Sequence, residues 1–414
     1  MHHNKMLNHV VAAIIVVFAL ISGELFISIL HNMQDEKNMA NESLVSSQNE
    51  YNIWIPSNLD EKMIKSIYTS YDEEKMGVNF KITMFSEEIY EDTLINAGIT
   101  NKLPDMFYIK NKQCLEQLVE IGGIMDLSEY VATKRLDRNF MKGTLEDFMI
   151  NRRIYGLPIM GEENVLYYNE DIFEACNMTY PKTYKEFIEV INQFKQIRVI
   201  PLSVGGASYE SVKCYFQMLV ENYGNIEEAA SALEELIKLE PFERKYEGIE
   251  EGDALSTFIR GESAMFIGTS TQASLLEGNR ARKKNFKVTA CPIGDKSINF
   301  GNYTYGFVLK SGSSFNREEV RDFYEKFSRD FSWEMTVFRG KGLPVYKNQK
   351  MEKTRFTLLN SCSEIMKESS KEGMWKYLIE SITKERLNEI YKEQIMGLFQ
   401  GKIDSKTFLS TLGL

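Results

Sequence analysis

Apolar and polar residues follow two different periods along this chain, and the two periods alternate. Residues 59–71 carry apolar side chains at helical spacing, whereas residues 78–85 alternate as a strand does. The other expected strands are 52–55, 106–109, 201–204, 264–267, 287–290 and 303–309, and the other expected helices are 87–97, 115–119, 184–194, 212–223, 226–239, 254–260 and 317–331. Alternating strands and helices predict the α/β class, with parallel sheets wound with helices.

Residues 154–170 stand at the centre of this pattern. Two β-type runs, 154–159 and 165–168, flank an acidic step that contains a glycine, and Asn169 then begins a helix. Pro158 fixes one φ angle and lacks a backbone donor, which suits a sheet edge or a crossing point better than a central strand. The segment is therefore expected to form a strand, a turn, a second strand and a helix start.

The N-terminus carries an apolar run, residues 10–30, that is long enough to span a bilayer. Glu24 interrupts this run and leaves residues 10–23 as a core of signal-peptide length. The run is either an uncleaved signal anchor or a signal peptide cleaved near Gly23, and both place the bulk of the chain outside the cytoplasm. Residues 31–50 are polar without an apolar period and predict a flexible spacer.

Composition excludes several kinds of chemistry. The chain of 414 residues is long enough for two domains or one large bilobal domain, and its net charge of −10 argues against a nucleic-acid partner. All four histidines lie at or before His31, so residues 51–414 cannot form Ser-His-Asp or Cys-His catalytic sets or the usual zinc sites. No nucleotide-binding glycine fingerprint is present, and neither a cofactor nor a metal is expected.

Two smaller questions concern acids and thiols. A glycosidase with paired carboxylates is the one enzyme class that composition leaves open. Glu162 and Glu163 are adjacent, and adjacent residues of a strand point to opposite faces, so the pair cannot flank one bond.

The five cysteines contain no Cys-x-x-Cys pair, and scattered buried thiols are expected.

Several short motifs occur in the order found in one protein family. The run Tyr-Gly-Leu-Pro at 155–158, followed by Tyr-Tyr-Asn-Glu-Asp-Ile-Phe at 167–173, resembles the segment where family-1 extracellular solute-binding proteins of ABC importers cross between lobes. The maltose-binding type is a member of that family. Further segments that match in order are 103–107, 181–187, 258–266 and 340–344, so the resemblance covers the chain from about Tyr51 to its end.

The resemblance implies a two-lobe, periplasmic-binding-protein-like fold of type II with hinge-crossing strands. Lobe 1 would comprise residues 51–157 with 306–345, and lobe 2 residues 158–302 with 346–414. The implied function is a monomeric extracytoplasmic receptor, not an enzyme, that traps a small polar solute such as a mono- or oligosaccharide and delivers it to ABC permease subunits. Two alternatives stay open, namely a membrane-anchored sensing or interaction module and, third, a carboxylate-type glycoside hydrolase. The lipid-attachment cysteine common in the family is absent, since the first cysteine is Cys114.

Loops at the strand ends are the expected ligand site. Glu162 matches a ligand-contacting carboxylate of the maltose-binding type, whereas Lys112 stands where that type has an acidic residue, which argues against a maltodextrin. Aromatic faces and fixed polar groups suit a sugar. The expected ligand-binding residues are Trp54, Ser57, Asn58, Asn111, Lys112, Glu162, Tyr209, Thr269, Ser270, Gln272, Tyr303 and Tyr305.

Structural roles remain open for some of these residues. Core packing is the alternative for Trp54, capping of the next helix for Asn58, and simple burial for the tyrosines. Tyr303 and Tyr305 are two positions apart on an expected strand, so alternation places them on the same face.

Overall fold

The computed structural model describes residues 50–59, 61–68, 79–278, 284–292, 301–312, 318–351, 355–372 and 385–414. The expected anchor or signal peptide, residues 1–30, and nearly all of the expected spacer lie outside these residues. Among the described residues, no helix combines the length and the apolar character needed to cross a bilayer.

The chain divides into two compact units of unequal size. The described part of the smaller unit is the start of strand β1 (Glu50–Pro56) and of strand β2 (Asn79–Phe85). There the rings of Tyr51 and Phe80 meet edge to face, with centroids 5.8 Å apart. The larger unit comprises residues 53–72 and 82–414, and the features that follow belong to it.

A mixed sheet organises the larger unit, with strand order β2-β1-β3-β10-β6-β8-β7 and with β9 also paired to β6. Strand β1 is parallel to β3 and β7 is parallel to β8, whereas β10 is antiparallel to both of its neighbours. This arrangement confirms the predicted α/β class. The expectation of parallel sheets is wrong, because β6 and β10 run antiparallel to their partners. The remaining strands are β3 (Met106–Ile109), β4 (Met149–Ile150), β5 (Arg153–Ile154), β6 (Gly156–Asn169), β7 (Ile200–Ser203), β8 (Ser263–Thr269), β9 (Phe286–Ala290) and β10 (Gly301–Leu309).

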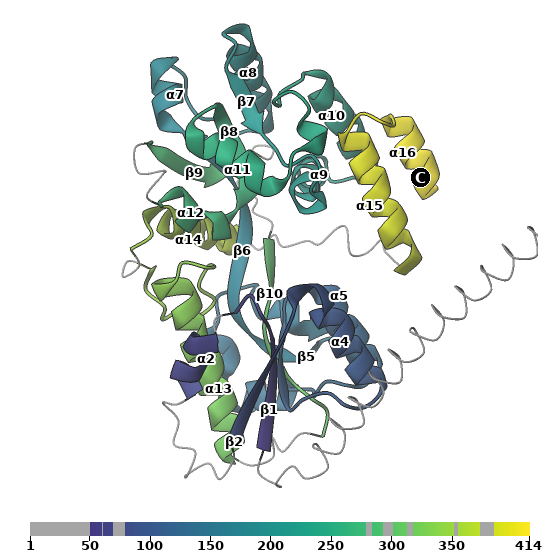
Figure 1. The fold of residues 1–414 in the computed structure, drawn as a ribbon, viewed down its shortest axis with the longest axis vertical. Helices are drawn as coiled ribbons and strands as arrows, with labels where there is room; N and C mark the ends of the chain where they lie inside the picture. The colour runs from purple at the N-terminus through teal and green to yellow at the C-terminus, as the bar shows by residue number, and fades with distance from the viewer. Residues whose placement is uncertain are drawn as a thin grey trace, which may run out of the picture. The chain divides into compact units, whose positions relative to one another are not determined.

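Strand β6 connects the two parts of this sheet. Its residues 156–163 pair with β10, and its residues 164–169 pair with β8 and β9 (Figure 1). The predicted turn within this segment is wrong, because the two runs form one strand of 14 residues. Gly161 exchanges two backbone hydrogen bonds with Leu343, at 3.0 and 2.7 Å, which helps to keep the acidic step extended. Pro158 lies in the part of β6 that pairs with β10. This agrees with the expectation that a proline, which lacks a backbone donor, suits a crossing point.

Helices connect most of the strands, and their starts follow local rules. Asn111 accepts a hydrogen bond from the Cys114 amide at 2.7 Å, and this cap begins α5 three residues before the predicted start. The helices are α2 (Glu61–Tyr68), α4 (Glu87–Ile99), α5 (Lys112–Glu120), α6 (Ser128–Lys134), α7 (Glu170–Ala175), α8 (Tyr184–Gln196), α9 (Tyr209–Tyr223), α10 (Ile226–Lys238), α11 (Glu251–Arg260), α12 (Ala273–Leu276), α13 (Glu318–Trp333), α14 (Thr357–Glu372), α15 (Glu385–Phe399) and α16 (Ser405–Leu412).

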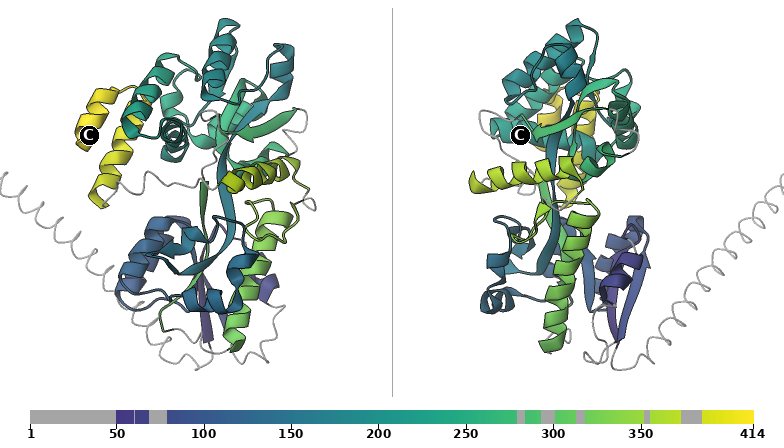
Figure 2. Two further views of the ribbon diagram at one scale, coloured as in Figure 1. Left: turned by 180° about the vertical axis from the view of Figure 1, so that it is seen from behind. Right: turned by 90° about the vertical axis from the view of Figure 1, so that its left-hand side faces the viewer.

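An apolar core lies among α8, α9, α10, α15 and α16. Phe187, Phe194, Phe216, Leu233 and Phe408 are all fully buried in it. Figure 2 shows α15 and α16, in yellow, beside α9 and α10, and these helices are in contact. The apolar faces of the predicted amphipathic helices therefore pack against one another and hold the C-terminal helices to this part of the chain.

All five cysteines are free thiols. Four of them are buried, and Cys176 is half-buried. The prediction of scattered thiols without a disulfide framework is confirmed.

Close packing of the crossing strands generates a first prediction. A Cβ atom at Gly161 would lie 2.0 Å from the ring of Tyr303, which is fully buried. We expect Gly161→Ala to lower the free energy of unfolding by about 1–3 kcal/mol through overpacking, measured by urea unfolding. Gly252→Ala in α11 is the control, since no atom lies within 4 Å of its Cβ position, and it should raise stability by about 0.5–1 kcal/mol. Equal stability of Gly161→Ala and the wild type would contradict the described packing.

Candidate functional site

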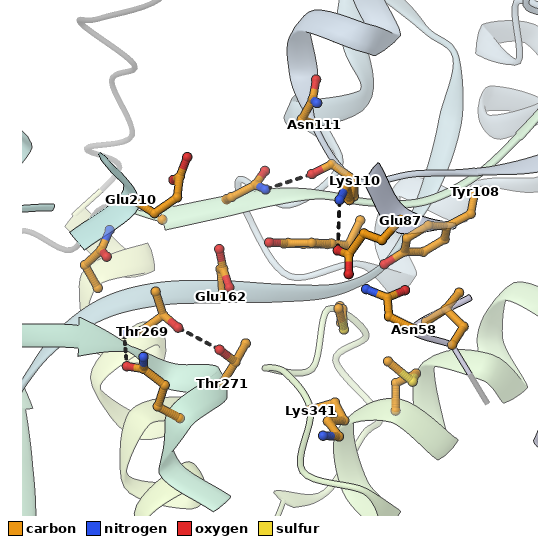
Figure 3. Close-up of a pocket in the computed structure, with 18 of the residues that line it drawn as sticks. Asn58, Glu87, Tyr108, Lys110, Asn111, Glu162, Glu210, Thr269, Thr271 and Lys341 are labelled. Carbon is orange, nitrogen blue, oxygen red and sulfur yellow. Dashed lines mark hydrogen bonds and ion pairs between the residues drawn. The ribbon is translucent and has the colours of Figure 1, made fainter. Parts of the chain in front are cut away.

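A cavity of about 920 Å³ opens beside the crossing of β6 and β10. One side is formed by residues near the ends of β1 and β3 and on α4 and α5, and the other by α9, α11 and the turn after β8 (Figure 3). The lining is rich in charge. Its carboxylates are Glu87, Glu91, Glu162, Glu210 and Glu251, and its cations are Lys110, Lys112, Lys213, Arg339 and Lys341.

Most of the cations already have partners within the protein. The Lys112 ammonium donates to the backbone oxygens of Asp147 and Met149, at 2.5 and 3.0 Å. It therefore anchors α5 to the segment that contains β4. The ion pairs of the other cations are Lys110 with Glu87 at 2.9 Å, Arg339 with Glu334 at 2.9 Å, and Lys213 with Glu210 at 3.9 Å.

Glu162 rises from β6 into the middle of the lining residues (Figure 3). Its backbone is opposite Asn302 of β10, and its carboxyl group accepts a hydrogen bond from the Tyr305 hydroxyl. Burial raises the pKa of Glu162 to about 7, and the negative charges of Glu210 and Glu251 act in the same direction. This carboxyl group is therefore poised between its two protonation states near neutral pH.

Glu163, the next residue, points to the opposite face of the strand. It is fully buried, and its Oε1 accepts a hydrogen bond from the Tyr303 hydroxyl at 2.7 Å. Its backbone amide donates to Ser270 Oγ at 3.1 Å. The expectation that the two acids face opposite ways is confirmed, and only Glu162 lines the cavity.

The two tyrosines of β10 do not share a face, so that prediction is wrong. Tyr303 is buried against Glu163, whereas Tyr305 lines the cavity and bonds to Glu162. The reason is an irregularity in the strand, because the register with β6 shifts between Asn302 and Tyr305 and again between Tyr305 and Gly306. A β-bulge of this kind re-aims side chains that simple alternation would place together.

The turn after β8 presents amide and hydroxyl groups to the cavity. Thr269 Oγ1 and Thr271 Oγ1 lie 2.6 Å apart, and Gln272 Nε2 donates to Glu251 Oε1 at 2.7 Å. The Gln272 amide oxygen accepts from the Thr269 backbone amide at 3.0 Å. Ser270 is buried instead, where it holds the backbone of β6. The turn therefore places three of its four polar side chains at the cavity.

The cavity brings together seven of the twelve expected residues, namely Asn58, Asn111, Lys112, Glu162, Thr269, Gln272 and Tyr305. Of the other five, Ser270 and Tyr303 are buried as described above. The ring of Trp54 lies against that of Phe85 at a tilt of 54°, with centroids 4.7 Å apart, and Ser57 is exposed. Tyr209 lies under Lys392, whose ammonium is 5.2 Å from the ring centroid. Both Trp54 and Tyr209 are half-buried and lie outside the residues that line the cavity.

Sequence reasoning missed several lining residues. Glu210 and Glu251 stand in the first turns of α9 and α11, positions that the helix dipole favours for acids, and this signal could have found them. Met335 and Arg339 had no such signal, since they lie at a π-helix, Glu334–Phe338, in which the Arg339 amide donates to the Glu334 oxygen at 3.0 Å. The remaining missed charged residues and the missed tyrosine are Glu87, Glu91, Lys110, Lys213, Lys341 and Tyr108.

Within the described ranges, no group of three or more His, Cys, Asp or Glu side chains is arranged to hold a metal ion. The carboxylates of the cavity bond to amides, hydroxyls and lysines of the chain.

Two parts of a sheet joined by crossing strands, with a polar cavity beside the crossing, define a two-lobe binding protein. The model of the bacterial extracellular solute-binding protein family matches residues 66–329, and the chain belongs to this family. Among curated proteins, a multiple sugar-binding protein of Streptococcus mutans is 18% identical over 156 residues. That match spans 37% of this chain and 36% of the relative.

Solved structures share the fold at low sequence identity. One, from work on xylan utilization by Caldanaerobius polysaccharolyticus, has a TM-score of 0.70 and 20% identity, and the match covers 88% of this chain and 98% of that one. A chitin oligosaccharide binding protein has a TM-score of 0.69 at 15% identity, with 88% and 97% covered. A maltose-bound protein of T. maritima has a TM-score of 0.67 at 15% identity, with the same coverage. The two-lobe fold predicted from the sequence is confirmed.

The two tyrosines of β10 give a second prediction. Tyr303→Phe removes the hydroxyl that donates to the buried Glu163 carboxylate, and we expect a loss of about 1.5–3 kcal/mol in the free energy of unfolding. Tyr305→Phe is the matched control, because its hydroxyl lies at the cavity, and it should cost less than about 1 kcal/mol. Urea unfolding of the two variants measures the difference, and equal losses would show that the two hydroxyls are not in different environments.

Proposed function

We propose that this protein is an extracytoplasmic receptor that binds a carbohydrate and delivers it to an ABC importer by hinge closure. The observation that carries the proposal is the polar cavity beside the crossing of β6 and β10. The names of the relatives support a carbohydrate ligand, since they include a multiple sugar-binding protein, a chitin oligosaccharide binding protein and a maltose-bound protein.

The lining suits the hydroxyl groups of a sugar. Carboxylates such as Glu162 accept hydrogen bonds, the amides of Asn58 and Gln272 both donate and accept, and the ring of Tyr305 offers an apolar face. The volume of about 920 Å³ lies near the upper end of the usual range for small-molecule sites, about 300–1,000 Å³. We therefore favour an oligosaccharide over a monosaccharide.

Closure follows from contacts on both sides of the cavity. A solute that touches Asn58 near β1 and also Thr269 of the turn after β8 makes its full set of contacts only when the two sides approach. Such a ligand shifts the population toward the closed state, which an ABC permease then recognises. In this proposal the lobes keep the boundaries expected from the sequence, 51–157 with 306–345 and 158–302 with 346–414.

The N-terminal run completes the proposal. We propose that residues 10–30 attach the protein to the outer side of the cell membrane, or release it if they are cleaved near Gly23. The receptor acts as a monomer and needs no catalysis, because its solute is passed on without a bond being made or broken.

A third prediction tests this function with two neighbouring residues. Isothermal titration with maltotetraose, xylotetraose and chitotetraose should give heat for at least one sugar, and small-angle scattering should show a smaller radius with that sugar. Asn58→Ala removes a polar group from the cavity and should weaken binding about three- to tenfold, the value of one neutral hydrogen bond. Ser57→Ala is the matched control, because Ser57 is exposed outside the cavity.

The outcomes separate clearly. Heat with the wild type, unchanged with Ser57→Ala and weakened with Asn58→Ala, supports the cavity as the binding site. Silence with all three sugars, or equal affinities for both variants, would contradict the proposal.

A further inference from the structure

The position of Glu162 within the cavity has a consequence for how a solute is bound. Its carboxyl group stands on the crossing strand, half-buried, and its neutral partner across the strands is the Tyr305 hydroxyl. Any solute that fills the cavity removes the remaining water from this group. A carboxyl group that loses water must gain hydrogen bonds from the solute or take up a proton.

The charged groups that face Glu162 come from several elements. Glu210 of α9 and Glu251 of α11 disfavour ionisation of Glu162, whereas Lys213 of α9 favours it. Tyr108 of β3 also responds to the Glu162 charge. The other charged lining residues are Glu87, Glu91, Lys110, Lys112, Arg339 and Lys341. Among these groups the Tyr305 hydroxyl is the hydrogen-bond donor to the Glu162 carboxyl group.

We propose that the ionised Glu162 carboxylate is the form that binds, so that capture of a hydroxyl-bearing solute releases the proton of any protonated Glu162 to the solvent. Because this rests on the receptor function proposed above, the solute is taken to be an oligosaccharide. Its hydroxyl groups supply further hydrogen-bond donors to the Glu162 carboxylate. In the step, the O–H bond of the carboxyl group breaks, the proton passes to the buffer, and the carboxylate accepts hydrogen bonds from the solute and from Tyr305.

The direction of the pH dependence follows from hydrogen bonding. In the empty cavity the pKa of Glu162 is raised to about 7, and hydrogen bonds from a bound solute to the carboxylate lower it. The ionised fraction falls as the pH falls through 7, and the affinity falls with it. Binding should be about tenfold weaker at pH 6 than at pH 8, and about half a proton should be released per solute at pH 7.

Other titratable residues of the chain affect how this proton release is measured. All four histidines lie at or before His31, so no histidine of residues 32–414 titrates between pH 6 and 8. Burial also raises the pKa of Glu91 and of Glu251, which makes these two acids the competing sources of a proton. Variants at Glu162 and Glu251 distinguish Glu162 from Glu251 as the source of the proton.

The experiment titrates the full chain with maltotetraose, xylotetraose and chitotetraose in phosphate and in Tris at pH 6, 7 and 8. The two buffers differ in ionisation enthalpy, so the difference in heat counts the protons released. We expect release from the wild type and the tenfold loss of affinity at pH 6. Glu162→Gln, which resembles the neutral form, should bind at least tenfold more weakly than the wild type at pH 8, with no dependence on pH or buffer. Glu251→Gln is the comparison variant. Its binding should still release a proton, with the midpoint moved below that of the wild type, because the Glu251 charge raises the pKa of Glu162.

A further variant tests the hydrogen bond from β10. Tyr305→Phe removes a donor that lowers the pKa of Glu162, so the midpoint of the affinity change should move above pH 7. A structural role alone would not move this midpoint.

Each outcome has one meaning. Heat without a buffer dependence, or proton release that persists in Glu162→Gln, would overturn proton coupling at Glu162 while leaving the receptor function intact. Absence of heat with every sugar at every pH would overturn the receptor function itself, and the coupling with it.

Discussion

The pairing of β6 with β10 is the constraint on which the rest of the structure depends. Strand β6 pairs with β10 along its first half and with β8 and β9 along its second, so it is shared by two parts of the sheet. Its backbone can stay extended over 14 residues because glycines allow close approach. Gly161 lies against the Tyr303 ring, and Gly301 lies against the Glu162 backbone oxygen. The crossing thereby fixes where the cavity can form.

The same pairing gives the adjacent acids Glu162 and Glu163 different roles. On one face Glu163 and Tyr303 form a buried hydrogen bond that belongs to the core, and on the other Glu162 and Tyr305 meet at the cavity. The bulge in β10 makes this possible, since a regular strand would aim both tyrosines at one face. The buried pair Glu163–Tyr303 and the cavity pair Glu162–Tyr305 thus lie on opposite faces of the same two strands. The position of the Glu162 carboxyl group therefore depends on the stability of the crossing.

Sequence reasoning reached the fold because hydrophobic period and capping are local signals. It placed β3 at its observed bounds, Met106–Ile109, and identified β6 and β10 as the crossing strands. It reached Glu162 through the resemblance of the surrounding motif. It did not foresee contacts that tertiary packing decides: the Trp54 ring lies against Phe85, the Lys112 ammonium donates to backbone oxygens, and the bulge separates Tyr303 from Tyr305. No sequence period records a register shift or a π-helix, so these residues could be placed only by the structure.

The central claim is that a solute is held at the crossing by the face of β6 that carries Glu162. A crystal structure of the full chain grown with a sugar that binds is the most direct test. The account predicts density for the sugar within hydrogen-bond distance of the Glu162 carboxyl group and the Tyr305 hydroxyl, with Asn58 and Thr269 on opposite sides of it. Density for the sugar at another surface, with this cavity holding only water, would contradict the account.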